Sequence, residues 1–133
     1  MTLALPTVTA AYAAFIGLLA AFLTVRVILN RVRFKVDVGD GGHPALAQAI
    51  RAHGNLAEHA PIALLLIGFA EALSAPRAAI VALGAALVLA RLASAWGLSR
   101  TLNQTAGRQS GAGLTVLVIV VSSLLILYRL LLR

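Results

Sequence analysis

The sequence predicts an all-α integral membrane protein in which residues 1–133 form a single domain, a bundle of four membrane-spanning helices. Of its 133 residues, 61% are hydrophobic and only 11% are charged, so the chain is far more apolar than an average soluble domain. Two long segments, Leu3–Val25 and Gln109–Tyr128, contain no charged residue. At about 1.5 Å per helical residue, each segment can cross a hydrocarbon core of about 30 Å.

We expect the helices at residues 5–29, 44–73, 77–98 and 108–131. The first and the last contain the two uncharged segments, whereas the middle two are apolar stretches interrupted by polar residues. The first apolar run is too long for the core of a signal peptide, and no basic residue precedes Arg26, so we expect it to remain as the first helix. The connection between the first two helices is rich in glycine and therefore a turn region.

The basic residues predict the orientation of the bundle. The net charge is +7, and in a four-helix topology the first and third loops share one face. The positive-inside rule places that face in the cytoplasm, and if the organism is bacterial the membrane is the inner one. The basic residues on this face are Arg31, Arg33, Lys35, Arg100 and Arg108. This topology explains the positive charge without a nucleic-acid partner. Such a partner is also disfavoured because aromatic residues, which would stack on bases, make up only 5% of the chain.

A polar stripe interrupts the second helix. An ionised side chain at the centre of a membrane helix costs about 2.5–3.5 kcal/mol on insertion scales, so such residues are candidates for function. At about 100° per residue, Arg51, Asn55 and Glu58 lie within about 60° of one another on the helix. On the same line the stripe continues with apolar side chains: Ile62, Leu65 and Phe69.

Two interpretations of this stripe remain open. In the first, Arg51 and Glu58 neutralise charges on other helices and hold a bundle or subunit interface together. In the second, Arg51 and Asn55 donate to an anionic group of a ligand while Glu58 accepts from an ammonium or amide group, which suits a zwitterionic, peptide-like molecule. A metal site is not predicted, because the two histidines of this helix, His53 and His59, do not converge with Glu58.

Two further arginines lie towards the cytoplasmic face. Arg91 of the third helix either reaches the lipid headgroups or faces the same cleft as the stripe. Arg108 lies at the start of the fourth helix. An arginine beside a thiol lowers its pKa and raises the thiolate fraction at neutral pH, and because the chain has no cysteine, such a thiol has to come from a ligand.

The segment Arg51–Pro61, RAHGNLAEHAP, resembles the R-A-x-x-N-x-x-E-x-x-P signature of the membrane-associated proteins in eicosanoid and glutathione metabolism, the MAPEG family. Arg91, followed by Gly97 and then Arg108, resembles the weaker second block of that family. The resemblance covers nearly the whole chain. It implies a homotrimer of four-helix subunits in the lipid bilayer, with glutathione as a cosubstrate bound between subunits near the cytoplasmic face.

The resemblance also implies roles for individual residues. Arg51, Asn55 and Glu58 would bind the glutathione backbone, and Arg91 would support the site. His59 and Ser94 stand where glutathione-using relatives have a tyrosine and an aromatic or histidine, respectively, so we include both among the glutathione-binding residues. Arg108 would stabilise the thiolate, with Arg100 as a competing match.

The function that follows is that of a glutathione transferase-like membrane enzyme, in which the thiolate attacks a lipophilic small molecule arriving from the bilayer; a peroxidase side activity is compatible. The alternative is a non-catalytic lipid- or peptide-binding member of the same family. A small multidrug transporter ranks third, because such transporters rely on a carboxylate in the first helix and none is present there.

Overall fold

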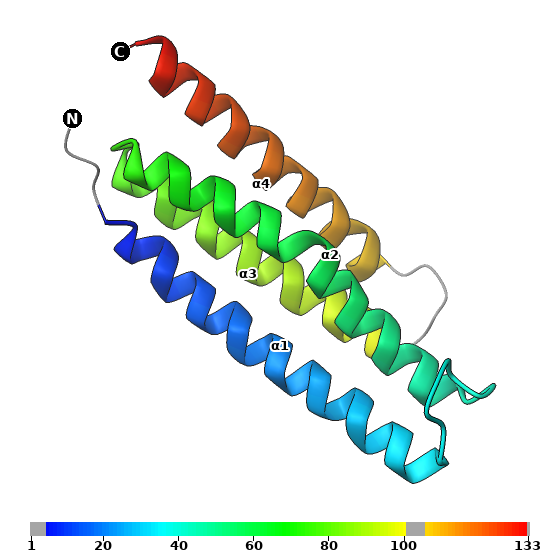
Figure 1. Ribbon diagram of the computed structural model, residues 1–133. Helices are drawn as coiled ribbons and strands as arrows, with labels where there is room; N and C mark the ends of the chain where they lie inside the picture. Colours follow the sequence, from blue (N-terminus) through cyan, green and yellow to red (C-terminus); the bar gives the residue numbers. More distant parts are fainter. Residues whose placement is uncertain (1–4, 101–105, 133) are drawn as a thin grey trace.

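The computed structural model describes residues 5–100 and 106–132, which form an antiparallel bundle (Figure 1). Its elements in chain order are α1 (Thr7–Phe34), α2 (Pro44–Ala72), α3 (Arg77–Arg100) and α4 (Ala106–Leu131). Helices α2 and α3 form the centre, and α1 and α4 flank this pair on opposite sides without contacting each other in the described residues. The start of α1 and the end of α4 lie at one end of the bundle (Figure 1). We call the opposite end, which contains the α1–α2 connection at residues 35–43, the loop-one end.

Helix α1 runs past its expected end at residue 29, as far as Phe34. No residue between 30 and 34 is a glycine or proline, so nothing local stops the helix there. It ends at Lys35, which adopts a left-handed conformation with φ 55°. The Arg31 guanidinium then holds the following turn by donating to the carbonyl oxygens of Val36, Asp37 and Gly39.

Three of the four helices are long and apolar enough to cross a bilayer: α1, α3 and residues Gln109–Leu131 of α4. Helix α2 is equally long, with 29 residues, but polar side chains such as Asn55, Glu58 and Glu71 lower its mean hydropathy. The structure thus confirms the expected all-α membrane architecture. Its most polar helix lies in the centre, in contact with the other three.

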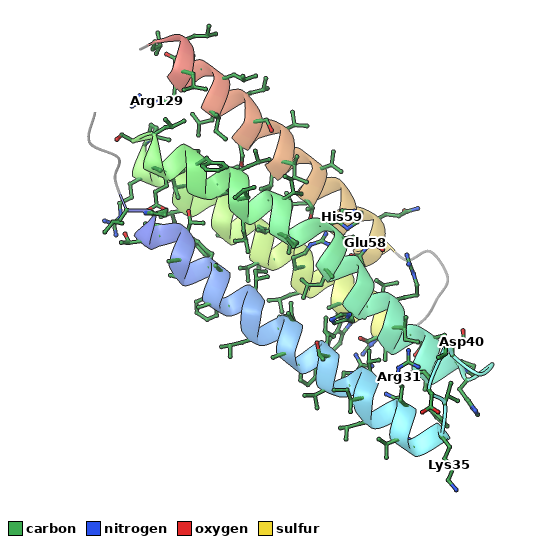
Figure 2. The ribbon with its side chains drawn as sticks, viewed as in Figure 1. Arg31, Lys35, Asp40, Glu58, His59 and Arg129 are labelled. Carbon is green, nitrogen blue, oxygen red and sulfur yellow. The ribbon has the colours of Figure 1, made fainter. Side chains whose placement is uncertain are left out.

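The distribution of side chains is that of a protein surrounded by lipid. The buried positions of α2 are mostly small residues, including Ala52 and Ala63, whereas large apolar side chains such as Phe15, Phe22 and Leu124 are exposed on the flanking helices. Small residues permit close helix packing in a membrane, where burying large apolar groups away from lipid brings little gain. Figure 2 shows Arg31, Lys35 and Asp40 at the loop-one end, and Arg129 at the other.

Two glycines allow close contacts between helices. A side chain at Gly84 would overlap the ring of Tyr12, so this glycine lets α1 approach α3. A Cβ at Gly111 would come within 2.7 Å of the Ala90 carbonyl oxygen, so α4 and α3 also pack closely. Gly17 and Gly113, by contrast, face open space.

A carboxylate at the end of α2 caps the beginning of α1. One Glu71 oxygen accepts from the Val8 N–H at 2.8 Å; the other accepts from the Thr9 N–H at 2.7 Å and from the Thr9 hydroxyl at 2.6 Å. The first N–H groups of a helix have no partner within it, and the helix dipole favours a negative charge there. Glu71 therefore joins two helices that begin and end at the same side of the membrane.

We expect Glu71→Ala to lower the free energy of unfolding by about 1–2 kcal/mol, the usual cost of losing a helix cap. Thermal unfolding in detergent, followed by circular dichroism, measures this change. The control is Glu58→Ala, which removes an exposed carboxylate from the same helix and should change stability by no more than about 0.5 kcal/mol. Equal losses in the two variants would contradict the capping role.

Candidate functional site

The polar stripe lies on the outer face of α2. The side chains of Arg51 and Glu58 are 49% and 56% exposed, and their nearest charged atoms, Arg51 Nη1 and Glu58 Oε1, are 4.0 Å apart. A pair this exposed and this distant is weak, so both groups remain available to a ligand. The apolar continuation of the stripe is exposed as well; it consists of Ile62, Leu65 and Phe69. The helical spacing thus brings the predicted residues to one face, as expected.

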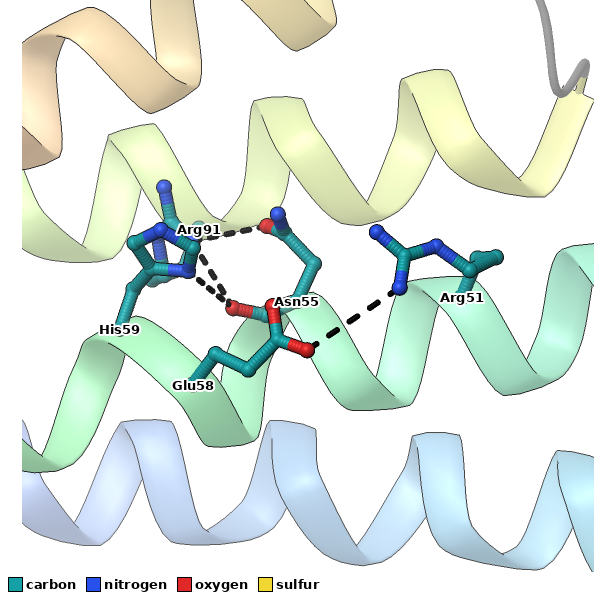
Figure 3. A network of polar contacts seen from close by, with 5 residues as sticks. All are labelled: Arg51, Asn55, Glu58, His59 and Arg91. Carbon is teal, nitrogen blue, oxygen red and sulfur yellow. Dashed lines mark hydrogen bonds and ion pairs between the residues drawn. The ribbon is translucent and has the colours of Figure 1, made fainter.

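Asn55, in the middle of the stripe, is held from behind by α3. Arg91 Nη1 donates to the side-chain oxygen of Asn55 at 2.9 Å and more weakly to its backbone oxygen at 3.4 Å (Figure 3). Because a guanidinium can only donate, the Asn55 amide must turn its Oδ1 towards Arg91. The group that Asn55 can offer to a ligand is therefore its NH₂, a hydrogen-bond donor.

Arg91 itself is buried, with 1% of its surface exposed. Its Nη2 donates to the Gly111 carbonyl oxygen at 2.9 Å, to the Thr115 hydroxyl and, at 3.4 Å, to Ser94. All these acceptors are neutral, and no carboxylate pairs with Arg91 in the part of the chain that the structure describes. Arg91 therefore lies inside the bundle, where it joins α2, α3 and α4, rather than extending to the headgroups or into an open cleft.

The two positions that depart from the family pattern also lie next to this network. His59 Nδ1 is 2.9 Å from the backbone oxygen of Asn55, one turn earlier. Since a carbonyl oxygen only accepts, Nδ1 carries the proton and Nε2 remains an acceptor when the ring is neutral. Ser94 is buried against Gly111. It contacts Arg91 and not the exposed face of α2.

Arg108 lies in the first turn of α4, but its side chain is outside the described part of the structure. The helical register places position 108 on the same face of α4 as Gly111 and Thr115, three and seven residues further on. Those two residues contact Arg91. The competing candidate, Arg100, ends α3 and places its guanidinium over the Trp96 ring, 4.5 Å from the ring centroid.

The histidines do not form a metal site with the stripe. Among residues 5–100 and 109–132, no three side chains of histidine, aspartate or glutamate gather closely enough to hold a metal ion. His53 faces the opposite way from the stripe and lines an apolar pocket of about 240 Å³ between α1 and α2, together with Ala57 and Pro61.

Sequence reasoning did not find every residue of this network. It assigned no contact with Arg91 to Thr115 or Gly111, whereas both accept hydrogen bonds from that side chain. An indication was present: a buried arginine needs acceptors, and a threonine facing the same bundle interior can supply one. It did not consider Glu71 at all, because a carboxylate near a helix end looks like an ordinary surface residue.

The arrangement offers a cation, an amide donor and a carboxylate on the outer face of one helix, between its loop-one end and its middle. These three groups complement a molecule that carries both a carboxylate and an ammonium group. Behind them, a buried arginine fixes the orientation of the amide. The site can therefore bind a zwitterion, and none of these residues forms the nucleophile–base pair that covalent catalysis by the protein requires.

The comparisons with known proteins identify the family of the chain. The profile of the MAPEG family matches residues 9–128, which include the whole polar stripe together with Arg91 and Arg108. The Escherichia coli protein called "Inner membrane protein YecN", from strain K12, is 35% identical over 108 residues, which are 81% of this chain and 81% of YecN. YecN from Escherichia coli O6:H1 matches to the same extent. The chain is a member of the MAPEG family.

Proposed function

We propose that this protein is a glutathione transferase-like membrane enzyme. It binds glutathione at the polar stripe of α2 and stabilises the thiolate for attack on lipophilic electrophiles. The observation that carries the proposal is the set of exposed groups on α2: the Arg51 guanidinium and the Glu58 carboxylate, 4.0 Å apart and each about half exposed in a chain that is 61% hydrophobic. Two opposite charges that pair only weakly are costly in a membrane protein unless a ligand or a partner also compensates them.

Each group of the stripe has a counterpart in glutathione. Arg51 pairs with a carboxylate of the tripeptide, and Glu58 accepts from its ammonium or from a peptide N–H. The Asn55 NH₂ donates to a peptide carbonyl. It is the group left for a ligand because Arg91 binds the amide oxygen. Arg91 thus acts as a positioning residue for Asn55, with Ser94 and Thr115 as its buried partners.

The chemical step needs little from the protein beyond charge. A free thiol with a pKa of about 8.5 is mostly protonated at neutral pH, and a neighbouring guanidinium increases the thiolate fraction. We assign this role to Arg108. The thiol proton leaves to solvent, the sulfur electron pair forms a bond to the electrophilic carbon, and the leaving group departs with its bonding electrons. Holding both reactants in one cleft supplies the remaining acceleration.

The exposed stripe is a surface in this single chain, and the proposal includes a homotrimer in which a neighbouring subunit covers it. The apolar residues that continue the stripe, Ile62, Leu65 and Phe69, are 45–53% exposed and would either contact that neighbour or admit a lipophilic substrate from the bilayer. We place the protein in the inner membrane, as the name of YecN indicates for that relative, with the loop-one end in the cytoplasm.

The test is binding of glutathione to the detergent-purified protein, measured by isothermal titration calorimetry. We expect Arg51→Gln and Glu58→Gln each to weaken binding by about tenfold or more, because hydrogen bonds to charged groups are the strong ones. Arg33→Gln removes an exposed arginine of α1 at the same end of the bundle and should leave affinity unchanged. If the wild type binds no glutathione at millimolar concentration, the proposed ligand is wrong.

A second candidate is a non-catalytic binding protein that uses the same stripe. It is favoured by Ser94, which is buried and directed towards Arg91, so this position offers a ligand no aromatic surface to stack on. Under this alternative, glutathione or another peptide-like molecule binds, but no thiolate accumulates and no conjugate forms.

A further inference from the structure

A second candidate site lies on the other side of the bundle, in a groove between α1 and α3. The groove has a volume of about 330 Å³. Its walls are apolar and include Leu19 and Phe22 of α1 and Leu92 and Trp96 of α3. Phe22, Leu92 and Trp96 are 59%, 49% and 66% exposed, so the groove opens onto the surface that faces lipid.

One end of the groove is polar and positively charged. Arg26 Nη1 donates a hydrogen bond to the Ser99 hydroxyl oxygen, and the Ser99 hydroxyl donates in turn to the Ala95 carbonyl oxygen at 2.6 Å. This chain of hydrogen bonds fixes the guanidinium against α3. No carboxylate pairs with Arg26 among residues 5–100 and 109–132, so its charge lacks a counterion within the described chain.

A second guanidinium adjoins the same groove. Arg100 lies over the Trp96 ring, with its central carbon 4.5 Å from the ring centroid, and Trp96 forms part of the groove wall. The stacking holds the Arg100 charge beside the groove instead of leaving it free in solution. Two arginines from different helices therefore border one apolar groove.

The depth of these residues matches the boundary of a bilayer. Arg26 is the first charged residue of the chain, and it follows the beginning of α1 at Thr7 by about 30 Å of helix, the thickness of a hydrocarbon core. Trp96 lies at the same distance from the beginning of α3 at Arg77. The apolar groove thus lies at acyl-chain depth, and the two guanidiniums lie at the level of lipid phosphates.

We infer that this groove is a binding site for one anionic phospholipid. The headgroup phosphate binds the Arg26 guanidinium, with Arg100 adding a second positive charge, and an acyl chain lies against Leu19, Phe22 and Leu92. Guanidinium groups bind phosphate oxygens in a bidentate manner, and the phosphate supplies the counterion that Arg26 lacks. The site is on the α1–α3 side, away from the outer face of α2, and does not depend on the proposed glutathione chemistry.

The chain contains its own probe for this site, because its only tryptophan is Trp96. The experiment reconstitutes the protein in vesicles of unlabelled phosphatidylcholine that contain increasing fractions of dibrominated phosphatidylglycerol or dibrominated phosphatidylcholine, whose bromine atoms quench fluorescence at short range. We expect Trp96 to be quenched at lower fractions of the anionic lipid. The preference should be about fivefold in relative binding constant, as for one basic residue at an anionic membrane surface.

Matched variants separate a specific site from a general attraction. Arg26→Gln should abolish the preference, whereas Arg33→Gln, an equal loss of charge on the last turn of α1, should preserve it. Leu92→Trp fills the groove but adds a second tryptophan, so this variant is made in a Trp96→Phe background. Quenching of the new tryptophan should then show no preference for the anionic lipid.

Three outcomes would overturn the inference. The first is equal quenching of the wild type by both lipids. The second is an equal loss of preference in Arg26→Gln and Arg33→Gln, which would indicate attraction to the surface charge as a whole. The third is the absence of quenching by either lipid, which would indicate that a second copy of the chain covers the groove.

Discussion

Replacing Arg108 with alanine is expected to lower the rate of glutathione conjugation by a factor of about 10²–10³. This is the usual loss when one group that stabilises a reacting anion, here the thiolate, is removed. In the proposed mechanism no protein base takes the thiol proton, so the guanidinium is the main reason for a thiolate at neutral pH. The thiolate absorbance of bound glutathione in the ultraviolet and turnover of an aromatic electrophile measure the effect.

The matched comparison is Arg100→Ala, which removes the other arginine that fits the family pattern. Arg100 stacks on Trp96, on the side of α3 that faces the α1–α3 groove, so its loss should leave the thiolate signal unchanged. If Arg100→Ala abolishes the thiolate and Arg108→Ala does not, the two assignments must be exchanged. If both variants retain full activity, arginine is not the activating group.

Replacing Arg91 with alanine is expected to produce the largest loss of stability, about 3 kcal/mol or more. The substitution removes hydrogen bonds from a charged donor to Asn55, Gly111 and Thr115, and it leaves a cavity where three helices meet. Thermal unfolding in detergent, followed by circular dichroism, measures the loss. Arg91→Lys should fall between the wild type and alanine, because one ammonium group cannot reach both Asn55 and α4 as the two guanidinium nitrogens do.

The same variants also test whether Arg91 acts on the site through Asn55. Arg91→Lys and Asn55→Ala should each weaken glutathione binding, and combining them should weaken it little more than Asn55→Ala alone, because coupled residues are not additive. Arg100→Ala, on an exposed position of the same helix, should change stability by no more than about 0.5 kcal/mol. Additive losses of affinity in the double variant would show that Arg91 acts independently of Asn55.

Much of the fold follows from local features of the chain. The uncharged segments near the two termini are sufficient to predict α1 and α4, and a period of 3.6 residues is sufficient to place Arg51, Asn55 and Glu58 on one face. The end of α1 was predicted too early, at residue 29 instead of Phe34. The apolar segment ends at Arg26, whereas the helix ends where the backbone of Lys35 becomes left-handed. The end of an apolar segment and the end of a helix need not coincide.

The partners across the bundle could not be predicted in the same way. Arg91 had two open interpretations, contact with headgroups or with a cleft, and the structure places it in neither location; it is buried against Asn55, Gly111 and Thr115. The Glu71 cap on Val8 and Thr9 joins residues more than sixty positions apart, a separation over which no periodic pattern extends.

The order of the amino acids is thus sufficient to predict a helical membrane protein, the residues of its polar stripe and the family of the chain. These properties depend on composition, helical period and a short signature, all of which act within a few turns of one helix. The contact of Arg91 with Asn55 inside the bundle, and that of Arg26 with Ser99 at one end of a groove, are visible only in the folded molecule. Those contacts arise from the way the helices dock, because packing of small residues such as Gly84 and Gly111 sets which distant side chains meet.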